Sequence, residues 1–99
     1  MEGKFRVNAW EPPGTKFFVR VGIPWAGPAS SLTYVFDGVE SVVWGRWFEA
    51  AVSKIQGSRP EMLRMFWELV QQVHNSSVQV SCTNRPEDAL RFAADLLDA

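Results

Sequence analysis

The chain has 99 residues, of which 46% are hydrophobic and 21% are charged, values that are typical of a globular domain and exclude a disordered chain. Ten basic and eleven acidic residues give a net charge of −1, which excludes a long-range field that would attract a nucleic-acid backbone or an anionic membrane. A charge this close to zero also weakens repulsion between copies and mildly favours a homodimer. The length predicts a single domain over residues 1–99.

The cysteine content and the N-terminal residues indicate a reducing compartment. Cys82 is the only cysteine, so the chain can form neither an intrachain disulfide nor a cysteine-based metal site. Residues 1–6 lack the apolar stretch of a signal peptide, and no apolar run in the chain is long enough to span a membrane. We therefore expect a cytoplasmic protein that has no membrane partner.

The first two elements predict a β-hairpin. Polar and apolar residues alternate over residues 4–10 and again over residues 16–23, which is typical of half-buried strands. Residues 11–15 between them contain two prolines and a glycine and are predicted to form the loop. The apolar faces consist of Phe5, Val7 and Ala9 on the first strand and Phe17, Val19, Val21 and Ile23 on the second.

A loop then leads to a third strand over residues 31–36, which is rich in β-branched and aromatic residues. Two interpretations of the next residues stay open. The Asp37-Gly38 pair between two β-prone runs is a hairpin signal, which would add a strand near residues 39–44. Asp37 followed three residues later by Glu40 is instead a capping box, which predicts the start of a helix.

A first helix is predicted to end before Gly57 and to start between Gly38 and Gly45. Gly45 inside the helix costs about 1 kcal/mol relative to alanine, which argues against the earlier start. The apolar residues that recur at the helical spacing i, i+3 and i+4 are Trp44, Trp47, Phe48, Ala51, Val52 and Ile55.

The second helix has a well-marked beginning. Ser58 as N-cap, Pro60 in the first turn and Glu61 at the capping-box position predict a helix that runs to about His74. Because it is apolar on nearly all sides, it lies in the centre of the core or is covered by a partner. After a turn, a fourth strand presents Val78, Val80 and Cys82 on one face, and a last helix carries Ala89, Leu90, Phe92, Ala93, Leu96 and Leu97.

The element order is therefore β-β-β-α-α-β-α. Strands mostly at the front of the chain and helices behind them predict an α+β fold. We expect an antiparallel-rich sheet of about four strands, with the helices packed on one face.

The outer face of the predicted hairpin is the candidate binding site. Arg6 and Trp10 on the first strand face the same way as Phe18 and Arg20 on the second, and Trp25 follows two residues after the second strand. If helices cover only the opposite face, these side chains form an exposed patch, and tryptophan and arginine are enriched among residues that carry interface energy. The equally weighted alternative is a second small core, in which the two tryptophans pack against the proline-rich loops.

The sequence contains no catalytic or cofactor motif. A cysteine nucleophile would need His74 as its base, but Cys82 shares a strand face with Val78 and Val80, which favours a buried and inert thiol. We expect no enzyme activity, no cofactor and no metal.

These observations favour a non-enzymatic protein-binding module that occupies the surface of another protein, as small inhibitors and adaptors do, including phage-type inhibitors of host systems. The first alternative is single-stranded nucleic-acid binding, in which bases stack on the aromatic rings beside Arg6 and Arg20. The second alternative is a small-ligand or anion site at the strand-to-helix turn formed by Cys82, Thr83, Asn84 and Arg85, where N–H groups at a helix start attract anions.

Overall fold

The computed structural model describes residues 4–12, 14–23 and 31–82. Its elements in chain order are the strands β1 (Arg6–Trp10), β2 (Lys16–Gly22) and β3 (Ser31–Asp37), the helices α1 (Ser41–Lys54) and α2 (Arg59–His74), and the strand β4 (Gln79–Cys82). The predicted α+β class and the succession β-β-β-α-α-β are thereby confirmed. The loop predicted over residues 24–30 and the helix predicted near the C-terminus lie outside the described residues.

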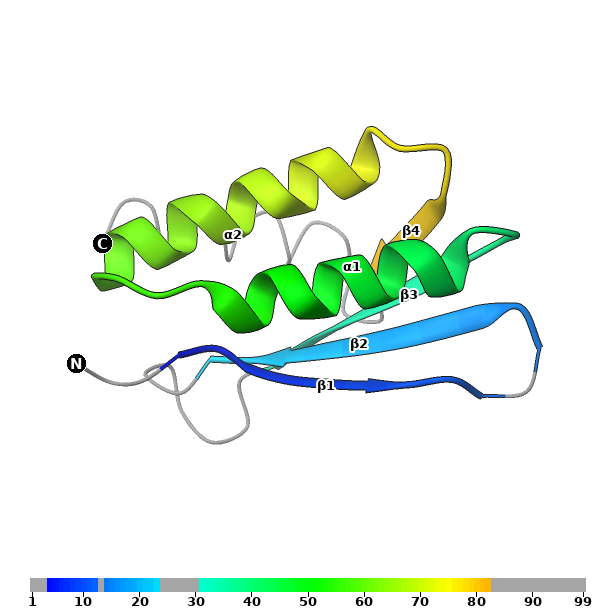
Figure 1. The fold of residues 1–99 in the computed structure, drawn as a ribbon, viewed down its shortest axis with the longest axis horizontal. Helices are drawn as coiled ribbons and strands as arrows, with labels where there is room; N and C mark the ends of the chain where they lie inside the picture. The colour runs from blue at the N-terminus through cyan, green and yellow to red at the C-terminus, as the bar shows by residue number, and fades with distance from the viewer. Residues whose placement is uncertain (1–3, 13, 24–30, 83–99) are drawn as a thin grey trace.

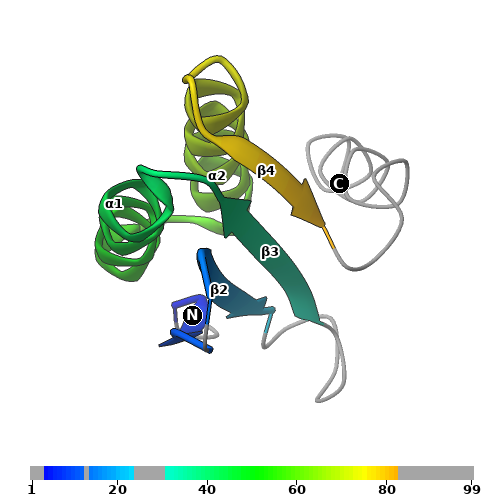
Figure 2. The same cartoon turned by 90° about the vertical axis from the view of Figure 1, so that its right-hand side faces the viewer.

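The four strands form one antiparallel sheet in the order β1-β2-β3-β4. The two helices connect β3 to β4 and lie side by side on one face of the sheet, as predicted (Figure 1). Viewed along the other direction, α1 and α2 again lie on the same side of the strands (Figure 2). None of the described elements covers the opposite face, and that face carries the candidate site.

The alternation of side chains along each strand decides which residues enter the core. On β2, the side chains of Phe17, Val19 and Val21 are almost completely buried against the helices, whereas Arg20 between them is exposed. The same alternation holds on β1, where Arg6, Asn8 and Trp10 are exposed and the residues between them are half-buried. The predicted orientation of the hairpin is therefore correct.

Aromatic rings fill the space between the sheet and the helices. The ring centroid of Phe48 on α1 lies 5.2 Å from that of Tyr34, 5.6 Å from that of Phe36 and 6.1 Å from that of Phe66 on α2. Phe5 adds a further contact, with its ring centroid 5.1 Å from that of Phe66. Tilted and edge-on arrangements of this kind are preferred by aromatic pairs, so they hold both helices against the same sheet.

The connection between β3 and α1 settles the two interpretations of residues 37–44. A short turn after β3 leads directly into the helix at Ser41, so no additional strand forms. The capping box does not form either, because Glu40 occupies the N-cap position and makes no side-chain cap hydrogen bond. The Asp37 carboxylate instead accepts a hydrogen bond from Thr15 Oγ1 at 2.9 Å. The turn requires glycine at position 38, since Gly38 has a φ of +112°.

Gly45, which argued against an early helix start, lies inside α1 and is buried. A Cβ atom at this position would overlap the ring of Phe17 on β2. The absence of a side chain therefore lets α1 approach the sheet closely. The intrinsic cost of glycine in a helix is offset by this packing, which sequence periodicity alone does not reveal.

The second helix begins as predicted, with Ser58 at the N-cap and Pro60 in the first turn. No side-chain hydrogen bond closes the predicted capping box. The helix presents one buried stripe to the core and leaves its remaining apolar residues half-buried. The buried residues are Met62, Leu63, Phe66, Val70 and Val73, and the half-buried ones include Met65, Trp67 and Leu69.

Candidate protein-binding face of the sheet

The strand register brings outward-facing residues into rows that cross the sheet. Trp10 on β1 lies opposite Phe18 on β2, Phe18 lies opposite Val35 on β3, and Val35 lies opposite Ser81 on β4. Directly opposed side chains on one face of an antiparallel pair are about 5 Å apart at Cβ and interact. The row therefore forms a continuous strip, three apolar side chains wide, on the face that no described helix covers.

Two aromatic rings form the centre of this strip. The rings of Trp10 and Phe18 stack with centroids 5.1 Å apart and an interplanar angle of 25°. Trp10 is 37% exposed and Phe18 is half-buried, so neither ring is sealed inside the molecule. The two side chains thus present an apolar surface to the solvent.

Arg20 extends the aromatic pair into a mixed surface. Its guanidinium carbon lies 5.2 Å from the centroid of the Trp10 ring, within the range of a cation–π interaction. We call Trp10, Phe18 and Arg20 the aromatic–arginine cluster. Trp10 contacts both other members, so it links the cluster.

The other two predicted site residues are not part of this cluster. Arg6 is exposed on the same face, but four residues from Trp10 along β1, a separation of about 13 Å along a strand. Its side chain lies beside Gly22, where an added Cβ would be 3.2 Å from the Arg6 Nε atom. Trp25 lies outside the described residues.

Val35 belongs to the face but was missed as a site residue. It is only 9% exposed, yet it alternates with Tyr34 and Phe36, which point to the helices. The alternation of side chains along β3 is enough to predict this, because residues 33 and 35 face outward when Tyr34 and Phe36 face the helices. Beyond Val35, a shallow open hollow is lined by Lys16, Asp37, Gln79, Val80 and Ser81.

The charges around the cluster have both signs. Lys16 and Asp37 lie opposite each other in the β2–β3 pair. Glu11, just after β1, lies 3.8 Å from Arg46 on α1, and both side chains are largely exposed. The face is therefore not a uniformly basic surface, although three of its side chains, Arg6, Lys16 and Arg20, are basic.

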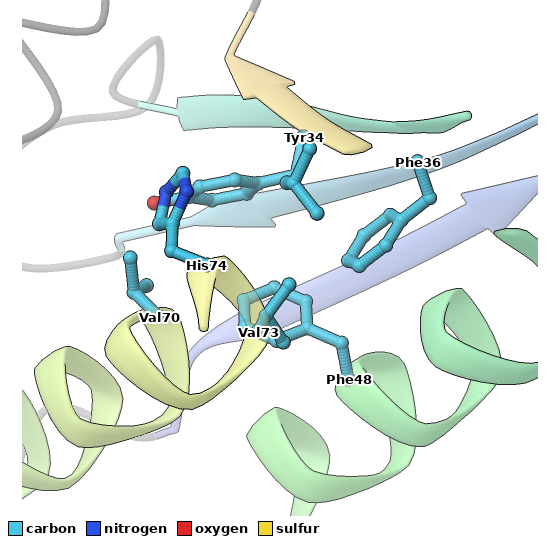
Figure 3. Close-up of a pocket in the computed structure, with 7 residues that line it drawn as sticks. Tyr34, Phe36, Phe48, Val70, Val73 and His74 are labelled. Atoms are coloured by element: carbon cyan, nitrogen blue, oxygen red, sulfur yellow. The ribbon is translucent and has the colours of Figure 1, made fainter. Parts of the chain in front are cut away.

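On the opposite side of the sheet, a small, partly open apolar pocket lies between β3, β4, α1 and the C-terminal part of α2 (Figure 3). Tyr34 lines it, and burial, with a smaller contribution from Cys82, raises the pKa of its hydroxyl far above the ordinary value. The phenol is therefore protonated at neutral pH. The residues that line this pocket are Tyr34, Phe36, Phe48, Val70, Val73, His74 and Val80.

Both residues of the Cys–His pair, which the sequence did not favour as a catalytic pair, are neighbours of Tyr34, since His74 lines the same pocket as Tyr34. His74 is exposed at the end of α2, and Cys82 lies opposite Tyr34 in the sheet. Cys82 faces the core side, as predicted, but it is half-buried rather than buried. Of the proposed anion site at residues 82–85, only this cysteine lies within the described residues.

A second exposed apolar patch, not predicted, lies at the start of α1. The side chains of Val39 and Val43 are exposed, and the rings of Trp44 and Trp47 meet edge-on at a centroid distance of 5.6 Å. Glu40 fixes this end of the helix, because its carboxylate accepts hydrogen bonds from Trp44 Nε1 at 3.2 Å and from Ser77 Oγ at 3.1 Å.

Within the described ranges, no three His, Cys, Asp or Glu side chains gather in a group that could hold a metal ion. None of the helices in this part of the chain is long and apolar enough to cross a membrane. Comparison of the chain with protein-family models, curated proteins and solved structures finds no match.

Proposed function

We propose that the protein is a non-enzymatic binding module that occupies the surface of another protein through the outer face of its sheet. The observation that carries this proposal is the aromatic–arginine cluster, in which the stacked Trp10 and Phe18 rings and the Arg20 guanidinium lie together on the face that none of the described elements covers. Aromatic and arginine side chains dominate the energy of protein interfaces. An inhibitor or adaptor, including a phage-type inhibitor of a host system, needs no more than such a surface.

The order of the cluster supports this function. Binding normally costs conformational entropy when flexible side chains become fixed at an interface. Here the rings are already stacked and the guanidinium already lies over the indole, which lowers that cost. The partner surface that suits the cluster offers an apolar depression for Trp10 and a carboxylate within reach of Arg20.

The test is capture of a partner from the native host with matched variants. We expect Trp10→Ala and Arg20→Ala to weaken capture by tenfold or more, the effect of an interface residue worth about 1.4 kcal/mol or more. Val43→Ala is the control, because Val43 is 69% exposed and lies on the helical side. Equal capture of the partner by the wild type and all three variants would exclude the outer face as the binding surface.

Single-stranded nucleic acid is the second candidate ligand of this face. Arg6, Lys16 and Arg20 share the face with two aromatic rings, which is the combination that binds bases and phosphates. Two features are unfavourable for nucleic-acid binding. The Asp37 carboxylate lies opposite Lys16, and the Trp10 ring on which a base would stack already contacts Phe18 and Arg20. A salt titration of oligonucleotide affinity separates the two functions, since phosphate contacts produce a steep fall of affinity with salt.

A further inference from the structure

Strand β1 forms one edge of the sheet and, within residues 4–12, 14–23 and 31–82, pairs with β2 alone. An edge strand presents a row of backbone N–H and C=O groups that can pair with another strand. Proteins usually block such edges with prolines, bulges or charges. From Arg6 to Trp10 there is no proline, only one charged residue, and an uninterrupted register with β2.

The core side of this edge is also incompletely covered. Val7 and Ala9 point toward the helices but are only half-buried, whereas Val19 and Val21 opposite them on β2 are completely buried. A strand added beside β1 would cover these two side chains. The edge thus offers backbone hydrogen bonds and apolar surface together.

We propose that β1 pairs antiparallel with β1 of a second copy of this chain, with the twofold axis at Asn8. In this register Arg6 lies opposite Trp10 of the second copy, Val7 lies opposite its Ala9, and Asn8 lies opposite its Asn8. Every residue of the strand is paired. Arg6 and Trp10 are both exposed on the outer face, so the pairing supplies two further arginine–tryptophan contacts across the interface.

The other antiparallel registers are poorer. An axis at Arg6 places two guanidinium groups directly opposite each other, and like charges in that position are destabilising. An axis at Val7, Ala9 or Trp10 leaves part of the strand without a partner. A register shifted by one residue pairs outward with inward positions, which places the two helical layers on opposite faces and is incompatible with a twofold axis. Only the axis at Asn8 pairs all five residues and keeps the helices on one side.

The dimer consists of one eight-stranded sheet with both aromatic–arginine clusters on the same outer face. A partner with two equivalent sites would then be held by both clusters at once, with a gain in avidity. Dimer formation does not depend on the binding function proposed above, and its test uses no partner.

The first measurement is the molar mass of the purified chain by light scattering and sedimentation, from low-micromolar to submillimolar concentration. We expect the mass to rise to that of a dimer. Asn8→Asp places two carboxylates opposite each other at the axis, so it should weaken the dimer by about fivefold or more. Because Asn8 is exposed, this variant should unfold at the same temperature as the wild type at monomeric concentration. A monomeric mass at every concentration would overturn the proposal.

Disulfide trapping tests the register itself. In a Cys82→Ser background, Asn8→Cys should form a covalent dimer on mild oxidation, because directly opposed Cβ atoms are about 4.5–5.5 Å apart and a small strand movement brings them to the roughly 3.5–4.5 Å of a disulfide. Arg6→Cys is the matched control, since its two copies would be about 13 Å apart along the strand and should not cross-link. Mixing Arg6→Cys with Trp10→Cys chains should restore cross-linking between unlike chains. Equal trapping of Asn8→Cys and Arg6→Cys would contradict the proposed pairing.

Discussion

Gly45 on α1 lies against the ring of Phe17 on β2 so closely that a Cβ atom at position 45 would overlap the ring. Both residues are buried, and the Phe17 ring is held between the helix and the neighbouring strands. This contact sets the distance between α1 and the sheet. Because Phe17 is on β2, the contact also supports the strand that carries Phe18 and Arg20 on the outer face.

Gly45→Ala should therefore destabilise the protein, although alanine is the better helix former. The propensity gain is about 1 kcal/mol, whereas inserting an atom into a packed core costs about 1–3 kcal/mol and shifts the Phe17 ring. We expect a net loss of stability in urea unfolding. A gain in stability would show that the helix can lift from the sheet without cost.

Ser41→Ala should also destabilise the fold, by about 1–2 kcal/mol. The buried Ser41 hydroxyl donates a hydrogen bond of 2.7 Å to the Thr15 carbonyl, which joins the start of α1 to the β1–β2 loop. Ser53 is a matched control, because its hydroxyl donates a bond of the same length to the Glu49 carbonyl but is exposed. Chemical denaturation of both variants should show a loss at position 41 and almost none at position 53.

Trp10→Ala should cost much less stability than Phe66→Ala. The indole is 37% exposed, so its removal should lower the free energy of unfolding by about 1 kcal/mol. The Phe66 ring is almost completely buried and contacts three other rings, so its removal should cost about 3–5 kcal/mol. Similar losses in thermal unfolding would mean that Trp10 belongs to a second core.

A double-mutant cycle of Trp10→Ala and Arg20→Ala measures the cation–π contact itself. We expect a coupling energy of about 0.5–1 kcal/mol, the range for an exposed pair. The measurement is the free energy of unfolding of the wild type, the two single variants and the double variant. A coupling of zero would indicate that the guanidinium is not ordered over the indole.

Alkaline pH should destabilise the protein through Tyr34, the only tyrosine in the chain. Burial raises the pKa of its hydroxyl above the ordinary value of 10.0, so the folded state favours the protonated form. The free energy of unfolding is therefore unaffected by the ionisation of Tyr34 below pH 10. Above pH 10 it falls by about 1.4 kcal/mol per pH unit, because the unfolded chain can ionise its tyrosine and the folded chain cannot. Phenolate absorbance should appear only as the chain unfolds, and the Tyr34→Phe variant should lose this part of the pH dependence. Ionisation of Tyr34 in the folded protein near pH 10 would contradict its burial.

Much of this structure follows from patterns in the sequence. Alternation along residues 4–10 and 16–23 correctly predicts which faces of β1 and β2 enter the core, because side chains in a strand alternate strictly. The helices, the fourth strand and the α+β class follow from periodicity and from the helix-start residues around Ser58. These features are local, so the local sequence is sufficient to predict them.

The errors arise where distant residues decide the outcome. The Asp37 side chain accepts a hydrogen bond from Thr15 instead of capping a helix. The Phe17 ring occupies the space beside Gly45. Thr15 and Phe17 are both far from these positions in the sequence, so local patterns do not reveal them. The meeting of Trp10 with Arg20, but not with Arg6, depends on the strand register, which the loop between the strands does not specify uniquely.

The strand order has a consequence for how the molecule assembles. The strands β1, β2 and β3 are joined in succession, whereas β4 reaches its place beside β3 only after two helices. Closing that long segment costs more chain entropy than forming the first connections, so β4 should join the sheet late in folding. The aromatic–arginine cluster lies entirely on β1 and β2. We therefore expect its surface to form before the amides of β4 become protected from hydrogen exchange.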